Sequence, residues 1–181
     1  DFNIFPFQCK NDLLKRLPGR LKGYKAWMPE TWAIFVLVDR DNDDCVALKQ
    51  QLENDAKEAG FLTKSNAQSG SQFKVANRIV IEELESWFFG DWQAVKDAYP
   101  KVPKTIPKKS PYRDPDAITG GTWESLERVF KRAGYFSTGL RKAECARQIA
   151  PHMKPERNQS RSFNAFCEAI NSISSSSRFT P

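Results

Sequence analysis

The stretch from Trp32 to Cys45, WAIFVLVDRDNDDC, constrains the fold more than any other part of the sequence. Its continuous apolar run, with β-branched Ile34, Val36 and Val38, is typical of a strand buried on both faces of a parallel sheet. The run stops at Asp39, and three more aspartates follow before Cys45. Active sites of open α/β sheets lie at the carboxyl ends of their strands. We therefore expect this stretch to form a central strand that leads into a functional site.

Asp39 and Asp41 are the first candidates for metal ligands. In an extended chain the side chains at i and i+2 share a face, so both carboxylates are expected to point into one site. Two neighbouring carboxylates repel each other unless a proton or a cation lies between them, and this favours a divalent metal. The alternative is that the aspartates cap the following helix, since Asp is favoured at N-caps and in first turns. That alternative suits Asp43 and Asp44 better than the first two.

A second acidic group follows a second predicted strand. Residues 75–81 are predicted to be a strand, and Glu82, Glu83 and Glu85 come directly after it. If the two strands are parallel neighbours, about 5 Å apart, both acidic groups face one crevice. The alternative for Glu83 and Glu85 is stabilisation of the first turn of the next helix through its dipole.

The basic residues lie mainly in the second half of the chain. Residues 1–100 hold 13 Lys and Arg against 15 Asp and Glu, whereas residues 101–181 hold 15 against 7. This distribution suits a metal site beside a polyanion-binding surface, although a solvated basic face is the simpler explanation. Residues 99–122 are rich in proline and are not expected to be helical. This segment either follows a phosphate backbone, wraps the domain or docks a partner, and its candidate nucleic-acid-binding residues are Lys104, Lys108, Lys109 and Arg113.

Several classes of function lack their signatures. The sequence has no GxSxG, P-loop, GxGxxG or HExxH motif. Four separated cysteines and a single histidine argue against structural zinc and favour free thiols in a reducing cytoplasm. No apolar run approaches the roughly 20 residues that span a bilayer. The remaining candidate functional residues are Asp, Glu, Lys and Arg. Such residues suit a site that binds Mg²⁺ or Mn²⁺ and hydrolyses phosphodiesters.

The predicted organisation is an α/β core followed by helices. We expect a core over residues 1–98, a basic connector over 99–122, a helical part over 123–173 packed on the same domain, and a disordered Ser-rich tail over 174–181. Within the core we expect a short strand at 2–7, a helix from Asn11 that is kinked or divided into two short helices at Pro18-Gly19, a helix from Cys45 to Ala59, and a strand followed by a polar loop at 61–72.

Longer motifs resemble a known family. The segments hhhhVDRD (h, hydrophobic), IEELESWFFGDW, YRDPDAITGGTWE, LRKAECARQIAPHM and PERNQSRSF are similar to a bacterial family of unknown function assigned to the Toprim fold and commonly encoded beside AAA-type ATPases. The resemblance covers nearly the whole chain. It implies a mostly parallel sheet flanked by helices. The family's first strand, which carries a glutamate, would precede Asp1.

The resemblance also implies roles for individual residues. Asp39-Arg40-Asp41 matches the Toprim DxD motif, Glu83-Leu84-Glu85 resembles the downstream Glu-x-Glu of OLD-like nucleases, and Lys142 resembles a lysine that opens a later helix. Mg²⁺ or Mn²⁺ would be held by Asp39, Asp41, Glu85 and Asp43. The catalytic candidates are Glu83, Lys142 and Arg141.

The implied function is that of a cytoplasmic Mg²⁺-dependent nuclease, the effector partner of an AAA-type ATPase in anti-phage defence. One alternative is a non-catalytic Toprim-fold subunit that docks the ATPase. Another is a phosphatase of the haloacid-dehalogenase type, which also places a DxD after a buried strand but usually has Thr or Val where Asp43 stands. DNA or RNA as substrate, and a homodimer as the assembly, are left open by the residues.

Overall fold

The computed structural model describes residues 2–68, 71–81 and 83–176. The chain divides into two compact units. Unit 1 combines residues 1–38, 43–79 and 169–181, and unit 2 combines residues 39–42 and 80–168. The boundaries predicted at 98/99 and 122/123 both lie inside unit 2. Each unit is described by itself below.

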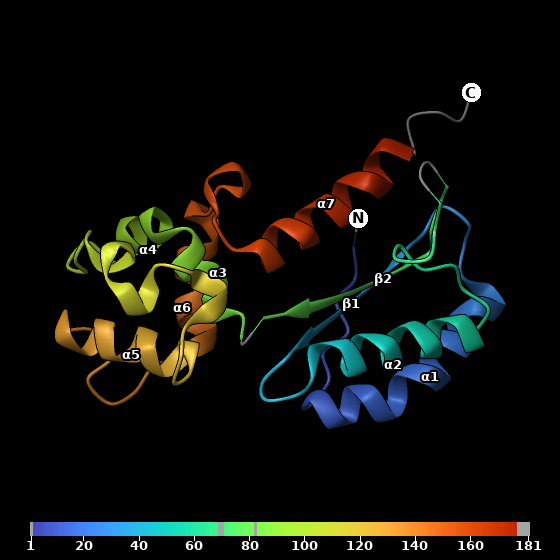
Figure 1. The fold of residues 1–181 in the computed structure, drawn as a ribbon, viewed down its shortest axis with the longest axis horizontal. Helices are drawn as coiled ribbons and strands as arrows, with labels where there is room; N and C mark the ends of the chain where they lie inside the picture. Colours follow the sequence, from blue (N-terminus) through green and yellow to red (C-terminus); the bar gives the residue numbers. More distant parts are fainter. Residues whose placement is uncertain (1, 69–70, 82, 177–181) are drawn as a thin grey trace. The chain divides into compact units, whose positions relative to one another are not determined.

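Unit 1 contains a two-stranded parallel sheet with helices (Figure 1). The backbone N–H of Ile34 donates to the Lys74 carbonyl (2.8 Å), and that of Arg40 donates to the Val80 carbonyl (2.9 Å). The same offset in both pairs fits parallel strands in register, as predicted. A single parallel bridge joins Thr63 to Val75. The elements are α1 (Lys10–Trp27), β1 (Ile34–Asp39), α2 (Cys45–Glu58), β2 (Val75–Val80) and the end of α7 (Arg161–Ser176).

The two faces of this sheet are covered by different elements. The packed helices α1 and α2 bring the apolar side chains Leu17, Leu21 and Leu52 against Val36 and Val38 of β1. On the other face, Ala169 and Ile173 of α7 form a smaller cluster with Phe35 and Ala76. The expectation of a strand between two apolar layers is therefore met, with the α1–α2 side the more deeply buried.

A buried carboxylate joins α2 to the segment that follows it. Glu53, which is 8% exposed, forms an ion pair with Lys49 (2.8 Å) and accepts hydrogen bonds from Thr63 and Asn77. These donors lower the pKa of Glu53 against the opposing effect of burial. Thr63 is thus held in two ways: by its backbone bridge to Val75 of β2 and by its side-chain hydrogen bond to the Glu53 carboxylate.

Three local predictions in unit 1 were wrong. The segment 2–7 forms no strand. Helix α1 is one helix that includes Pro18, and not two short helices, because Leu13, Leu17 and Leu21, on both sides of the proline, pack into the same cluster. The described residues 61–68 and 71–72 contribute only the isolated bridge at Thr63 where a strand was expected. By contrast, α2 ends just before Gly60 as predicted: its last residue is Glu58, Ala59 is the C-cap, and Gly60 follows with φ +80°.

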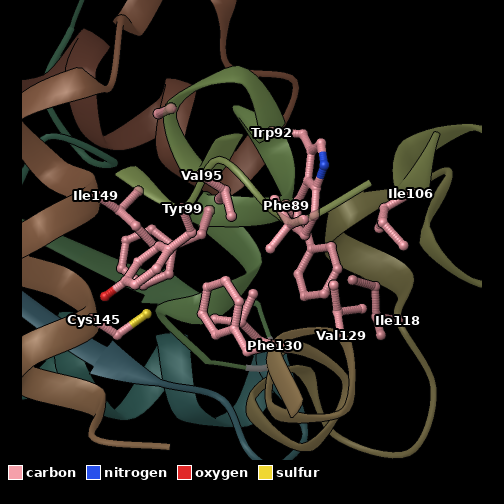
Figure 2. Packing of buried hydrophobic residues seen from close by; sticks show 14 residues of the cluster. Phe89, Trp92, Val95, Tyr99, Ile106, Ile118, Val129, Phe130, Cys145 and Ile149 are labelled. Carbon is pink, nitrogen blue, oxygen red and sulfur yellow. The ribbon is translucent and has the colours of Figure 1, made fainter. Parts of the chain in front are cut away.

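Unit 2 is built from short helices around one aromatic cluster (Figure 2). Phe89, Phe130 and Ile149 come from three different helices, Tyr99 caps the end of a fourth, and all four side chains are buried in the cluster. The helices of the unit are α3 (Glu85–Gly90), α4 (Trp92–Ala98), α5 (Thr122–Arg132), α6 (Lys142–Ile149) and the start of α7. Five 3-10 turns complete the described elements: Ile106–Lys108, Ser110–Tyr112, Pro115–Ala117, Ala150–His152 and Pro155–Arg157.

The proline-rich segment 99–122 wraps unit 2. Val102, Ile106 and Ile118 belong to its buried cluster, and the indole N–H of Trp92 donates to the Pro103 carbonyl (2.9 Å). The prolines open the 3-10 turns, where a missing N–H costs nothing. Of the three alternatives left open by the sequence, wrapping the domain is the one that these contacts show.

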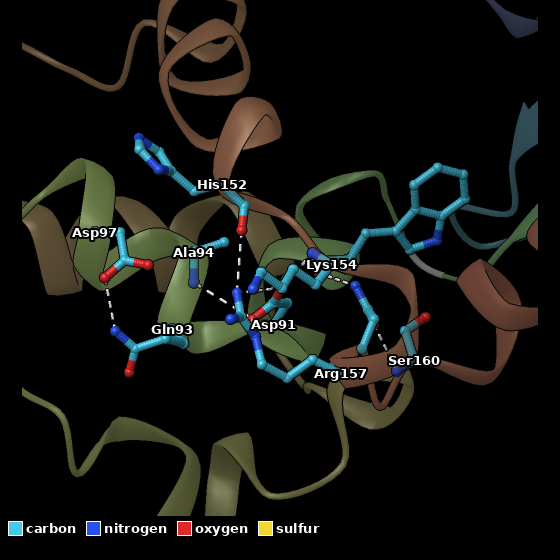
Figure 3. Close-up of polar contacts among 10 residues, drawn as sticks. Asp91, Gln93, Ala94, Asp97, His152, Lys154, Arg157 and Ser160 are labelled. Atoms are coloured by element: carbon cyan, nitrogen blue, oxygen red, sulfur yellow. Dashed lines mark hydrogen bonds and ion pairs between the residues drawn. The ribbon is translucent and has the colours of Figure 1, made fainter.

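Two buried aspartates fix the last part of unit 2. Asp91 accepts a bidentate pair from Arg157 (2.8 and 2.9 Å) and also hydrogen bonds from the backbone of Ala94 and Lys154 (Figure 3). Asp116 accepts bonds from Ser160 and from the first residues of α7. Both carboxylates are less than 8% exposed. Asp91 ties the turn at residues 154–157 to the α3–α4 corner, and Asp116 ties residues 160–162 to the 3-10 turn Pro115–Ala117.

The fold class is mixed α/β and rich in helix. Helix α7 includes residues 174–176, and the remainder of the predicted disordered tail lies outside the described residues. Among the helices that the structure describes, none is both long and apolar enough for a membrane span.

Candidate functional site

Asp39 and Asp41 stand where β1 gives way to a turn. Asp39 is the last residue of the strand. Asp41 has φ +49°, in the left-handed region that Asp and Asn enter more readily than most residues. The prediction that the two share a face as i and i+2 of an extended chain was therefore wrong in its geometry. Their charges nevertheless act on each other, because the Asp41 carboxylate contributes to the raised pKa of Asp39.

Glu83 and Glu85 follow β2 and belong to unit 2 with both aspartates. Glu83 caps the start of α5: its Oε2 accepts hydrogen bonds from the Thr122 hydroxyl (3.0 Å) and the Trp123 backbone N–H (3.1 Å). Glu85 opens α3 and is 6% exposed. The helix-stabilising alternative is therefore correct for Glu83, although the helix that it stabilises is α5 and not the next one in sequence.

Lys142 supplies the positive charge at this site. It is the first residue of α6, and its Nζ lies 3.3 Å from Glu83 Oε1 and 3.6 Å from Glu85 Oε1. The same ammonium lies 5.0 Å from the centroid of the Trp123 ring. Asp39, Asp41, Glu83 and Glu85 are called the carboxylate cluster below. The two acidic strand ends thus converge in one unit, as the sequence predicted.

The carboxylate cluster holds more negative charge than Lys142 neutralises. The pKa of Asp39 is raised from 3.8 to about 6, first by burial and then by the charges of Asp41, Glu85 and Glu83. Lys142 acts in the opposite direction but does not offset them. Burial also raises the pKa of Glu85 despite the adjacent ammonium. A cation or a proton would relieve this repulsion.

The cluster suits one kind of metal better than another. In the described residues, no three Asp, Glu, His or Cys side chains are placed to hold one ion together. Mg²⁺ is usually bound by one or two carboxylates, with waters and substrate phosphates completing its shell. Carboxylate oxygens meet that requirement, so Asp39 and Asp41 could hold such an ion. In the described part of the chain, these residues do not form a structural metal site in which the protein supplies every ligand.

The other predicted site residues have different surroundings. Asp43 belongs to unit 1 and pairs with Lys10 (2.9 Å), and Asp44 caps α2 through the Ala47 N–H (2.7 Å). Arg141 pairs with Glu144 (3.0 Å). The described contacts bring neither Asp43 nor Arg141 to the carboxylate cluster. The predicted nucleic-acid-binding residues Lys104, Lys108, Lys109 and Arg113 are exposed on unit 2.

Sequence reasoning missed Thr122 and Trp123. Both lie directly after the Gly120-Gly121 pair, and both donate to Glu83. A tryptophan in the first turn of a helix, just after two glycines, is the signal that was available in the sequence. What the sequence could not show is that this helix begins beside residues that lie about 40 positions earlier in the chain.

The fold and the site define a helix-rich α/β protein with a carboxylate cluster and a lysine at the ends of two parallel strands. A family model described as a domain of unknown function, DUF4276, matches residues 2–171, and the chain belongs to that family. Comparison with curated proteins and with solved structures gives no match. The resemblance to a family of unknown function is thereby confirmed, and the Toprim and OLD-nuclease assignments stay predictions.

Proposed function

We propose that this protein is a Mg²⁺-dependent nuclease with a Toprim-like carboxylate site. The supporting observation is the convergence in unit 2 of four carboxylates from two strand ends, of which Asp39 has a pKa raised to about 6 by burial and like charges. Such an arrangement is unfavourable without a cation, and perturbed carboxylates of this kind are concentrated at functional sites. The adjacent Lys142 matches the need for a cation beside a phosphodiester.

The contacts of each residue indicate its role in the proposed reaction. Asp39 and Asp41 would hold the metal, which when bound lowers the pKa of water and offsets charge on the leaving oxygen. Glu85 suits the role of proton acceptor better than Glu83, because its pKa is raised and a base nearer to neutral pH is more effective. Glu83 is already occupied as the cap of α5, and so it positions Lys142.

Lys142 would change partners during the reaction. Its ammonium neutralises Glu83 and Glu85 in the structure. With a metal beside these carboxylates, the same ammonium is free to neutralise the scissile phosphate. The wider role, as the effector of an AAA-type ATPase in defence against phage, rests on the sequence resemblance alone.

The test is cleavage of plasmid DNA and of tRNA by the full-length protein with Mg²⁺ or Mn²⁺. We expect the double variant Asp39→Ala/Asp41→Ala to lose activity by at least about 100-fold, on the scale of acid–base and metal contributions. Asp97→Asn, which changes an exposed carboxylate on α4, is the matched control and should retain activity. Cleavage that survives loss of both aspartates would exclude this site as the catalytic one.

A second candidate function is that of a non-catalytic interaction subunit. Unit 1 exposes two tryptophans that contact each other, with Trp27 60% and Trp32 48% exposed and their ring centroids 6.1 Å apart. Exposed apolar surface of this kind marks interaction sites. If the protein only docks a partner, calorimetric titration should detect no Mg²⁺ or Mn²⁺ binding, whereas the nuclease requires it.

A further inference from the structure

Trp123 is an aromatic residue of unit 2 that lies outside the aromatic core. Eight other aromatic side chains of the unit belong to its buried cluster or pack against it, and Trp87 contacts Phe163 and Phe166. Trp123 is not among the described side chains of either group. It is half-buried, and the contact recorded for its ring is with the Lys142 ammonium. Core packing therefore does not account for an indole at this position.

The backbone around Trp123 is fixed beside the carboxylate cluster. Gly120 and Gly121 have φ +79° and +84°, a region that other residues rarely adopt. A Cβ on Gly121 would also lie 1.7 Å from the Glu124 carboxylate oxygen. The turn that they form delivers Thr122 and Trp123 to Glu83, which accepts a hydrogen bond from each. The backbone of Trp123 is thus held by the same carboxylate that pairs with Lys142, and the indole lies against that ammonium.

The pair of Trp123 and Lys142 has the chemistry of a nucleotide site. A partly exposed indole offers a flat apolar surface on which any nucleobase can stack. The ammonium above it is a point charge suited to the phosphate attached to that base. A nucleobase that stacked on the Trp123 ring would take the place of the Lys142 ammonium there. Lys142 would then be able to pair with the phosphate attached to that base. One aromatic ring and one lysine would then recognise the two halves of a nucleotide.

We infer that Trp123 stacks on an unpaired base next to the scissile phosphate, so that the substrate is single-stranded DNA or RNA, or a strand with an unpaired base at the cleavage point. This inference rests on the proposed nuclease function, whose substrate class it specifies. Bases within a duplex are covered on both faces by their neighbours, and stacking on a protein side chain requires that a base be taken out of that stack. Intact duplex should therefore be bound and cleaved poorly.

Binding can be measured separately from cleavage. The fluorescence anisotropy of a fluorescein-labelled oligo(dT) would be followed with the full chain in EDTA, beside a duplex of the same length. We expect Trp123→Leu to weaken oligo(dT) binding by about 5- to 100-fold, the range measured for one stacked base, with a change of less than about twofold for the duplex. Trp123→Phe should restore most of the affinity. Trp32→Leu, an exposed tryptophan of unit 1, is the matched control and should bind as wild type does.

An oligonucleotide with abasic sites tests the same point on the unaltered protein. We expect wild type to bind it more weakly than oligo(dT), and Trp123→Leu to bind both equally. Equal binding of the two oligonucleotides by wild type, or binding of duplex as tight as that of oligo(dT), overturns the inference.

The two proposals fail in different ways. Mg²⁺-dependent cleavage that does not depend on Trp123 overturns the stacking role and leaves the nuclease in place. Trp123-dependent binding without cleavage supports the binding site and overturns the nuclease. Absence of both binding and cleavage overturns the two together.

Discussion

Asp39 is held in surroundings that disfavour its charge. It is partly buried at the end of β1 and feels the charges of Asp41, Glu85 and Glu83, whereas Lys142 offsets only part of their effect. For an acid whose pKa is higher in the folded than in the unfolded state, ionisation lowers the free energy of unfolding. This loss begins as the pH rises above 3.8 and is complete above about 6. At neutral pH, in the absence of metal, Asp39 therefore destabilises the fold.

We predict that Asp39→Asn raises the stability of the metal-free protein at pH 8. The free energy of unfolding should increase by on the order of 1–3 kcal/mol, as the size of the pKa shift implies, because Asn carries no charge to be repelled. The gain should shrink toward pH 4, where Asp39 is protonated in the folded protein. Urea denaturation in EDTA at the two pH values measures both effects.

Asp97→Asn is again the control, and its stability should differ little from that of wild type at either pH. Addition of Mn²⁺ should stabilise wild type but not Asp39→Asn, because a ligand that binds only the folded state raises its stability. A destabilised Asp39→Asn at pH 8 would show that the carboxylate is compensated in a way that these contacts do not provide.

At the scale of elements, Asp91 joins the α3–α4 corner to the turn at 154–157. Asp91 is 2% exposed. Its carboxylate accepts hydrogen bonds from Nε and Nη2 of Arg157 and from the backbone N–H groups of Ala94 and Lys154. Removal of the buried carboxylate leaves the Arg157 guanidinium, whose side chain is 34% exposed, and the Lys154 N–H without this acceptor. This contact links the middle of unit 2 to its end.

We predict that Asp91→Ala lowers the free energy of unfolding by about 3–5 kcal/mol. The exposed pair of Arg141 and Glu144 supplies a comparison, since Glu144→Ala should cost no more than about 1 kcal/mol. Thermal or urea unfolding of the two variants measures the difference. Similar losses in both would mean that burial of Asp91 does not strengthen its ion pair.

The elements that the sequence predicted correctly are those marked by local signals. The β-branched run to Val38 gives β1, and Gly60 ends α2, because both signals act within a few residues. The chain does not divide into two helices at Pro18. Burial of Leu17 and Leu21 stabilises the continuous helix by more than the loss of one backbone hydrogen bond at the proline destabilises it. Contacts with distant helices determine the course of segment 99–122, and its local composition does not reveal them.

In the candidate site too, some features could be predicted from local signals and others depend on contacts between distant parts of the chain. That two acidic strand ends would meet followed from the parallel pairing of β1 and β2. The capping of α5 by Glu83 and the position of Trp123 depend on a helix that starts 39 residues later. No periodicity or spacing in the sequence connects these parts. Lys142 entered only through the resemblance to known nucleases.

At the scale of the whole molecule, the two units do not follow the two halves of the sequence. Unit 2 includes the loop 39–42 and therefore takes both aspartates of the DxD from the first half of the chain. It carries 16 Lys and Arg against 14 Asp and Glu, so the strong charge asymmetry between the halves is not an asymmetry between units. The cation that contacts the carboxylate cluster is Lys142, which pairs with Glu83 and Glu85.

The central claim is that Asp39 and Asp41 together bind a divalent cation. Isothermal titration of the full chain with Mn²⁺ tests it most directly, with Asp39→Asn/Asp41→Asn and the Asp97→Asn control measured under the same conditions. We predict saturable binding by wild type and by Asp97→Asn, and loss of that binding in the double variant. Unchanged Mn²⁺ binding in the double variant, or none in wild type, would contradict the claim.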